Sequence, residues 1–143
     1  MGSHHSRQLN EVNLSMASLS LHAMRTQGRR VHYSFRLYII YDGKRVLGKG
    51  GAQILNAVDQ LGSLRAAAKK LNMSYRFVWN SIQRTQERLG KPVVVTRRGG
   101  MPHNRKKGGG STRLTTIGKA LLRDYRSMEE RLESQIRGKS LYL

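Results

Sequence analysis

Between residues 31 and 48, apolar and more polar side chains alternate, and this two-residue period is typical of a β-strand with one buried face. Asp42-Gly43 interrupts the alternation, and Asp-Gly between strand-forming segments favours a type I′ turn, which needs a positive φ at both central residues. We therefore predict a β-hairpin with strands at about 32–41 and 44–48. The alternating positions are Val31, Tyr33, Phe35, Leu37, Ile39 and Tyr41.

The apolar spacing then changes to steps of three and four, which predicts one α-helix at about 51–61 and a second at about 64–71. Gly62 lies between them and suits the left-handed conformation in which many helices end. Ser63 is placed to cap the second helix, because its side-chain oxygen can accept a hydrogen bond from a free amide of the first turn. The apolar positions are Ile54, Leu55, Val58 and Leu61 in the first helix, and Leu64, Ala67, Ala68 and Leu71 in the second.

A three-residue turn at 72–74 leads into a third helix at about 75–89, which Gly90 ends. The alanines at 66–68 allow two helices to cross closely, so the pair matches a helix-turn-helix, whose second helix offers its outer side chains to the major groove of DNA. Taken alone, the pair fits an ordinary helical hairpin with a solvated face better, and only the charge and the second hairpin reverse that preference. The positions predicted to read bases are Ser74, Tyr75, Arg76, Asn80, Gln83 and Arg84.

Strand-forming residues flank a glycine-rich basic loop in 93–114, which predicts a second hairpin of the kind called a wing. Such a loop can approach the phosphate backbone closely because glycine has no side chain, and arginine side chains also suit a narrow minor groove. Basic residues of the preceding helix complete the predicted backbone-binding set. That set is Ser63, Arg65, Lys69, Lys70, Arg97, Arg98, Arg105, Lys106, Lys107 and Arg113, and His103 lies in the same loop.

A last helix is predicted at about 115–137, where apolar residues recur at steps of three and four. This seam of near-heptad steps is typical of a helix that pairs with a second copy of itself, so we predict a homodimer. The alternative is a helix that packs only in the core of its own chain. The predicted dimer interface consists of Ile117, Leu121, Tyr125, Met128, Leu132 and Ile136.

Charge narrows the choice of partner. The chain has 143 residues and a formal net charge of +19, which favours a polyanion, either nucleic acid or an anionic membrane surface. Thirteen basic residues and a single acidic one, Glu87, fall between 63 and 113, a net of +12. Because this charge lies on the helix-turn-helix and its wing, we predict double-stranded DNA as the partner and no membrane. With 38% hydrophobic residues the chain can form one core of modest size.

Other chemistry has little support in the sequence. The absence of cysteine excludes disulfides and thiol catalysis, and no phosphate-binding glycine motif is present. His22, His32 and His103 lack partners at metal-ligand spacing, and the eight acidic residues form no catalytic pair. We therefore expect no enzyme activity, no metal and no cofactor. Trp79, the single tryptophan, could stack on DNA, but we favour a role in covering the junction between the third helix and the first hairpin.

Residues 1–30 show no apolar period and begin Met-Gly-Ser-His-His, which matches the remnant of a vector-encoded tag. We expect these residues to be a flexible leader, in which Met16 and Met24 are both suitable natural starts. The DNA-binding domain is then expected over 31–143.

Two groups of residues resemble the N-terminal DNA-binding domain of ModE, the family of molybdate-responsive transcriptional regulators, which is related to the LysR-type winged helix-turn-helix. The first group runs from Leu61 to Trp79 and includes Gly-Ser-Leu before the first helix of the pair and Ser-Tyr-Arg before the second. The second comprises the glycines at 108–110 and Leu-Thr-Thr-Ile-Gly at 114–118. The resemblance covers about 33–134.

The resemblance implies a dimeric winged helix-turn-helix that binds palindromic operator DNA, with Ser74, Tyr75 and Arg76 at the start of the recognition helix. ModE proteins carry a molybdate-binding region after this domain, and this chain ends at Leu143, so it is either a fragment or a stand-alone member. Molybdate sensing therefore does not carry over, and the sequence gives no evidence of another small-molecule effector. The segment 101–107 inserted in the wing is more basic than the family pattern.

The sequence therefore predicts a mainly α protein with β-hairpins, of class α+β, with the winged helix-turn-helix fold. Its predicted function is that of a sequence-specific transcriptional regulator in the cytoplasm, associated with the nucleoid. The alternative is an abundant architectural protein that coats DNA with little sequence preference, which the excess of charge outside the recognition helix favours.

Overall fold

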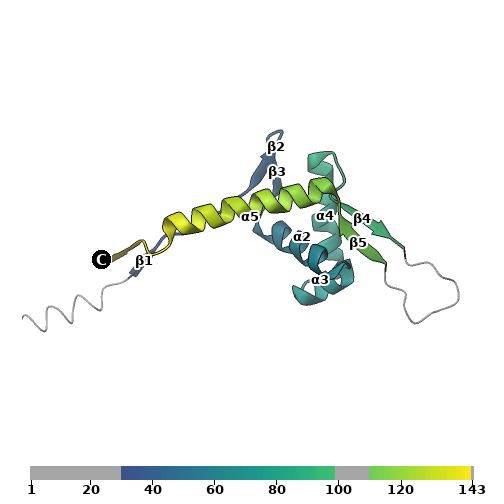
Figure 1. Ribbon diagram of the computed structural model, residues 1–143, viewed down its shortest axis with the longest axis horizontal. Helices are drawn as coiled ribbons and strands as arrows, with labels where there is room; N and C mark the ends of the chain where they lie inside the picture. Colours follow the sequence, from purple (N-terminus) through teal and green to yellow (C-terminus); the bar gives the residue numbers. More distant parts are fainter. Residues whose placement is uncertain (1–29, 99–109, 143) are drawn as a thin grey trace, which may run out of the picture. The chain divides into compact units, whose positions relative to one another are not determined.

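The computed structural model describes residues 30–98 and 110–142 (Figure 1). Residues 1–29 of the predicted leader, and the wing loop with His103, Arg105, Lys106 and Lys107, lie outside the described residues. The chain divides into two compact units. The larger spans residues 35–135, and the smaller contains the described residues on either side of it.

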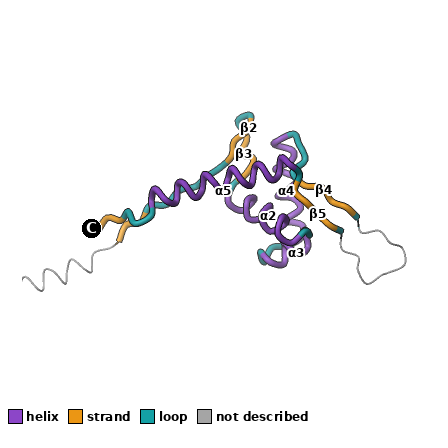
Figure 2. Tube along the Cα trace, viewed as in Figure 1, coloured by secondary structure: helices purple, strands orange, loops and turns teal. Residues whose placement is uncertain are grey.

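In its described residues the larger unit consists of four helices and two antiparallel β-hairpins, which confirms the predicted α+β class and the winged helix-turn-helix fold. Figure 2 shows α2, α3 and α4 gathered beside the first half of α5, with β4 and β5 projecting from the helices as a two-stranded ribbon. None of the helices in the described part of the chain has the length and apolarity that crossing a bilayer requires. The elements are β2 (Ile39–Tyr41), β3 (Lys44–Leu47), α2 (Lys49–Leu61), α3 (Leu64–Lys70), α4 (Tyr75–Leu89), β4 (Val94–Arg97), β5 (Ser111–Leu114) and α5 (Thr116–Ile136).

The first hairpin has the predicted turn but a much shorter first strand than predicted. Asp42 and Gly43 have φ values of 48° and 69°, as a type I′ turn requires. The strand predicted at 32–41 is wrong over most of its length, because only β2 pairs with β3 and the register is irregular between Ile39 and Ile40. The alternation has another cause: Leu37 packs against the core although residues 33–38 form no strand.

The helices begin and end where the sequence predicted, within two residues, because their ends are set by local groups. Gly62 and Gly90 take the left-handed conformation at the ends of α2 and α4, with φ of 65° and 71°. The Ser63 hydroxyl oxygen accepts a hydrogen bond of 3.3 Å from the amide of Ala66. At the start of α4 the Ser74 hydroxyl oxygen accepts one of 3.1 Å from the amide of Phe77.

The core of the larger unit lies where α2, α3 and α4 meet the first half of α5. Val58, Ala67, Val78 and Val93 come from four different segments, and each has 0% of its surface exposed. Ala67 allows α3 to lie close to its neighbours, because a larger side chain at a fully buried position needs a space that close packing does not leave. The core thus fixes the helix-turn-helix pair against the base of the wing.

The smaller unit contains a two-stranded antiparallel sheet that joins distant parts of the chain. Strand β1 (Arg30–His32) pairs with β6 (Ser140–Tyr142), and Val31 lies opposite Leu141. The pairing was not predicted, since nothing in either three-residue segment identifies the other as its partner.

Candidate nucleic-acid interface

The recognition helix α4 has one face in the core and the opposite face in solvent. Val78, Ile82 and Thr85 are buried, at steps of four and three. The helical period therefore directs positions 76, 80, 84 and 87 away from the core. Arg76, Asn80 and Arg84 are exposed, as predicted for side chains that reach base edges, and Gln83 is half-buried on the flank.

The start of α4 combines a capping serine with exposed aromatic side chains. The Ser74 oxygen caps the helix, which leaves its hydroxyl hydrogen for a further acceptor such as a phosphate. Tyr75, Phe77 and Trp79 are 51%, 49% and 38% exposed. Trp79 lies four residues after Tyr75 and therefore shares its flank of α4. Because 38% of its surface is exposed, Trp79 covers the neighbouring structure only in part. Phe77 was not predicted as a site residue, because a phenylalanine in a helix is usually a core residue.

The basic residues of this region are all exposed. Ten lysines and arginines lie in the described residues between 63 and 113, and none is buried. Lys70 Nζ donates a hydrogen bond of 2.8 Å to Gln60 Oε1, which holds that lysine beside α2. In the described part of the chain the one ion pair is Arg123–Asp124, at 3.6 Å and outside the helix-turn-helix. The positive charge of α3, α4 and the wing is therefore not neutralised by carboxylates described around it.

The wing is a regular hairpin whose two faces differ. Its register places Val95 opposite Arg113 and Arg97 opposite Ser111, and these four side chains are exposed on one face. On the other face Thr112 is 2% exposed, and its backbone amide donates a hydrogen bond of 2.8 Å to the carbonyl of Gly62. The exposed face thus offers two arginines at diagonal positions, on strands anchored at the junction of α2 and α3.

The wing root, which we define as residues 92–94, is held by side chains that were not predicted as site residues. Gln86 Oε1 accepts hydrogen bonds from the backbone amides of Val93 at 3.0 Å and Val94 at 3.3 Å. Thr115 Oγ1 donates a hydrogen bond of 2.8 Å to the carbonyl of Pro92, and also accepts one of 3.0 Å from the amide of Gly118 as the cap of α5. The Thr-x-x-Gly spacing before the last helix was a signal for the cap, but nothing in the sequence points to Gln86.

The other side of α4 is tied to the first hairpin. Thr85 Oγ1 lies 3.2 Å from the carbonyl oxygen of Val46, and Arg88 Nη1 donates a hydrogen bond of 2.7 Å to the carbonyl of Arg45. The guanidinium of Arg45 in turn lies 3.7 Å from the centre of the Tyr38 ring. Side chains of α4 therefore bind both hairpins, and one basic residue of α4, Arg88, has a structural contact.

The residues predicted for the dimer interface differ in their surroundings. Tyr125 is 2% exposed in the core of its own chain, which leaves it little surface to offer a partner. Burial, and to a lesser extent the nearby charges of Glu129 and Tyr38, raise the pKa of its hydroxyl above the ordinary value. Met128 is 45% exposed. Ile117 and Leu121 are partly buried against the core, and Leu132 and Ile136 are partly exposed.

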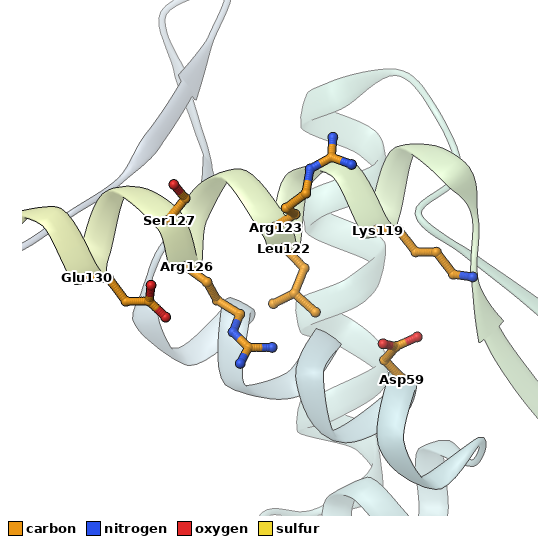
Figure 3. A pocket seen from close by; sticks show the side chains of 7 residues that line it. All are labelled: Asp59, Lys119, Leu122, Arg123, Arg126, Ser127 and Glu130. Carbon is orange, nitrogen blue, oxygen red and sulfur yellow. The ribbon is translucent and has the colours of Figure 1, made fainter.

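An open cavity of about 460 Å³ lies between α2 and the opposite flank of α5 (Figure 3). Asp59 of α2 points towards α5, and the residues that line the cavity carry both charges. A smaller cavity of about 170 Å³ extends beside Asn56, which accepts a hydrogen bond of 3.3 Å from Arg126 Nη1. We assign no ligand to either cavity, because neither combines apolar walls with converging polar groups. The larger cavity is lined by Asp59, Lys119, Leu122, Arg123, Arg126, Ser127 and Glu130.

The helix-turn-helix pair, the capped α4 and the wing lie in a segment that matches a known family. Residues 51–119 match the model of the bacterial regulatory helix-turn-helix proteins of the lysR family. This part of the chain is therefore similar to the LysR-type helix-turn-helix domains. The match includes α3, α4, both strands of the wing and the first turn of α5, which carry most of the predicted interface.

Two proteins connected with molybdenum by name are similar to part of this chain. The chain is 32% identical over 83 residues to the molybdenum-pterin-binding protein MopB of Rhodobacter capsulatus, covering 58% of this chain and 28% of MopB. It is 31% identical over 84 residues to the molybdenum transport protein ModE of Azotobacter vinelandii, covering 59% of this chain and 29% of ModE. These matches confirm the resemblance to the ModE DNA-binding domain. The chain spans less than a third of the length of either relative.

Among solved structures, the chain is similar to ArgP from Mycobacterium tuberculosis. The two are 30% identical with a TM-score of 0.44, and the match covers 61% of this chain and 28% of ArgP.

Proposed function

We propose that this chain is a sequence-specific, double-stranded-DNA-binding regulator of transcription and has no enzymatic activity. The recognition helix α4 would enter the major groove, where Arg76 suits the paired acceptors of guanine and Asn80 suits adenine. Arg65 and Lys69 of α3 and the arginines of the wing would hold phosphates on either side.

The observation that carries this proposal is the outer face of α4. Arginine and asparagine side chains are exposed there at helical spacing, and exposed basic residues of α3 and the wing accompany them in the same segment that is similar to the LysR-type domains. A helix pair with a merely solvated face has no need of ten exposed basic side chains and one acidic one in this segment. The high positive charge instead suits a surface that displaces counterions from a polyanion.

The proposal predicts a steep dependence of DNA affinity on salt. If each protomer neutralises about five phosphates, the logarithm of the binding constant of a dimer falls against the logarithm of salt concentration with a slope of about −9. The slope is measured by titrating the protein with an unlabelled duplex at several salt concentrations between 50 and 300 mM. Binding is followed by the fluorescence of Trp79, the single tryptophan. A nearly flat dependence would overturn the proposal.

Dimerisation through α5 is the second part of the proposal. Met128 is exposed beside Leu121 and Leu132, and such an apolar stripe suits pairing with a second copy of the same helix. Two recognition helices related by a two-fold axis would then bind two half-sites of a palindrome.

A coating protein with little sequence preference is the second candidate, and the net charge of +19 favours it. Competition between a selected duplex and random DNA of equal length separates the two candidates. A ratio of affinities of about 10³ or more supports the regulator, and a ratio near one supports the coating protein.

A further inference from the structure

The wing root is the place where the recognition helix, the wing and the last helix are joined by hydrogen bonds. Gln86 of α4 binds the amides of Val93 and Val94 through a single side-chain oxygen. The carbonyl of Val93 accepts a hydrogen bond of 2.9 Å from the amide of Thr115, just before α5. Each neighbour therefore holds a different set of backbone groups in the same short segment.

Val93 is fully buried, so its backbone amide cannot turn to water if Gln86 is replaced by an apolar residue. In the described part of the chain, the bonds of Gln86 are the side-chain hydrogen bonds that join α4 directly to the first strand of the wing. The contacts on the other side, from Thr115 and Gly118, join the same segment to α5 instead. The wing is also held to α2 through the bond from the Thr112 amide to the Gly62 carbonyl, but its direct side-chain bonds to α4 pass through one amide oxygen.

We propose that Gln86 is a positioning residue for DNA binding, which aligns the wing with the recognition helix so that both contact the same duplex. The inference rests on the DNA-binding function proposed above. Gln86 is half-buried and faces the wing root, so its part is to hold β4 in place while Arg97 and Arg113 make the contacts with phosphates.

A glutamate at position 86 is expected to hold the wing in line with α4 as Gln86 does, and a methionine is not. Gln86→Met keeps the length of the side chain but removes the acceptor oxygen. Gln86→Glu keeps an oxygen that can accept from both amides. The added negative charge of the glutamate weakens DNA binding in general, so the comparison concerns the effect of the wing arginines and not the absolute affinity.

A double-mutant cycle tests the proposal. The wing variant Arg97→Ala/Arg113→Ala is made in the wild-type, Gln86→Met and Gln86→Glu chains, and duplex binding is titrated against salt at a temperature where all variants are folded. In the wild-type chain, the wing variant is expected to reduce the steepness of the salt dependence by about 0.9 for each phosphate that the protein no longer neutralises. In Gln86→Met the same wing variant is expected to change the steepness hardly at all, and in Gln86→Glu the full reduction is expected.

Arg76→Ala in the same three chains is the matched control, since Arg76 lies on the outer face of α4 and not on the wing. Its effect is expected to be the same in all three chains. If the wing and Gln86→Met effects are additive, Gln86 only stabilises the fold, and the proposal is wrong although DNA binding stands. If the wild-type chain binds no duplex, the proposed function fails, and this inference fails with it.

Discussion

At the scale of single residues, the wing root leaves no room for side chains that the helix α5 would otherwise tolerate. A Cβ atom at Gly118 would overlap the carbonyl oxygen of Val93, and that oxygen cannot move because the amide of Thr115 binds it. Gly118 is therefore required for close packing, and its place in the first turn of α5 is a consequence of the wing lying against the helix.

Gly118→Ala is expected to lower the free energy of unfolding by about 2 kcal/mol, because overpacking costs ~1–3 kcal/mol and the gain in helix propensity returns at most ~1 kcal/mol. Urea denaturation measures the change. Gly50→Ala is the matched control, since a Cβ there meets no atom within 4 Å. Equal stability of the two variants would contradict the role of close packing at Gly118.

Glu87 is the single acidic residue among those between 63 and 113, and it is exposed on the outer face of α4. It lies three residues after Arg84 and seven after Asn80, so it shares their face. Glu87→Gln is expected to raise the affinity for random DNA roughly two- to fivefold at low salt, because a carboxylate there repels phosphates with ~0.5–1 kcal/mol. Glu133→Gln, the same change on α5, serves as the control and is expected to have a smaller effect.

Tyr125 links stability to alkaline pH. Burial raises the pKa of its hydroxyl in the folded chain above the ordinary value of 10.0, so the neutral form is favoured by folding. The stability that this provides is complete below pH 10.0 and is lost as the pH rises through the folded-state pKa. We expect the free energy of unfolding of Tyr125→Phe to fall less between pH 9 and 11 than that of the wild type. Denaturant titrations at each pH measure both values. Identical pH profiles for the two chains would rule out this linkage.

At the scale of elements, α4 combines two tasks on opposite faces. Its inner face carries the buried Val78 and Ile82, and its flanks bind the first hairpin through Arg88 and the wing root through Gln86. The outer face is left free of such contacts at Arg76 and Asn80. The separation allows the outer residues to be substituted without disturbing the contacts that hold the fold.

Arg76→Ala is expected to reduce the ratio of affinities for selected and random duplexes by about tenfold or more, since a bidentate contact to guanine contributes ~1–3 kcal/mol of discrimination. Lys69→Ala, on the exposed surface of α3, is expected to weaken binding to both duplexes similarly. Fluorescence anisotropy with the two duplexes in parallel measures both ratios. An equal loss on both duplexes for Arg76→Ala would mean that Arg76 contacts only the backbone.

At the scale of the whole molecule, the proposed dimer depends on the apolar stripe of α5. Met128 is 45% exposed, so Met128→Asp is expected to disturb the fold little while placing a charge in the proposed contact between copies. We expect the variant to sediment as a monomer at concentrations where the wild type is a dimer. Ser127→Asp places the same charge one residue away, towards the cavity flank, and is expected to remain dimeric. A monomeric wild type would show that α5 does not pair.

The helices of this protein and their ends could be predicted from the sequence because their causes are local. Ser63 and Ser74 cap with their own oxygens, and Gly62 and Gly90 take a conformation that glycine adopts at little cost. The strand expected at 32–41 failed because alternation reports burial on one side and says nothing about a strand partner. For the same reason, the pairing of β1 with β6 was not visible.

In the candidate interface too, some features have local causes and others depend on contacts between distant segments. The outer positions of α4 follow from the helical period once the buried face is known, so Arg76, Asn80 and Arg84 were identified from the sequence. By itself the sequence thus determined the helices, their caps and the place of the positive charge, since these depend on neighbours within a few residues. Only the tertiary structure decided that Gln86 holds the wing root and that Gly118 packs against it, because these contacts join segments whose distance is set by the packing of the core.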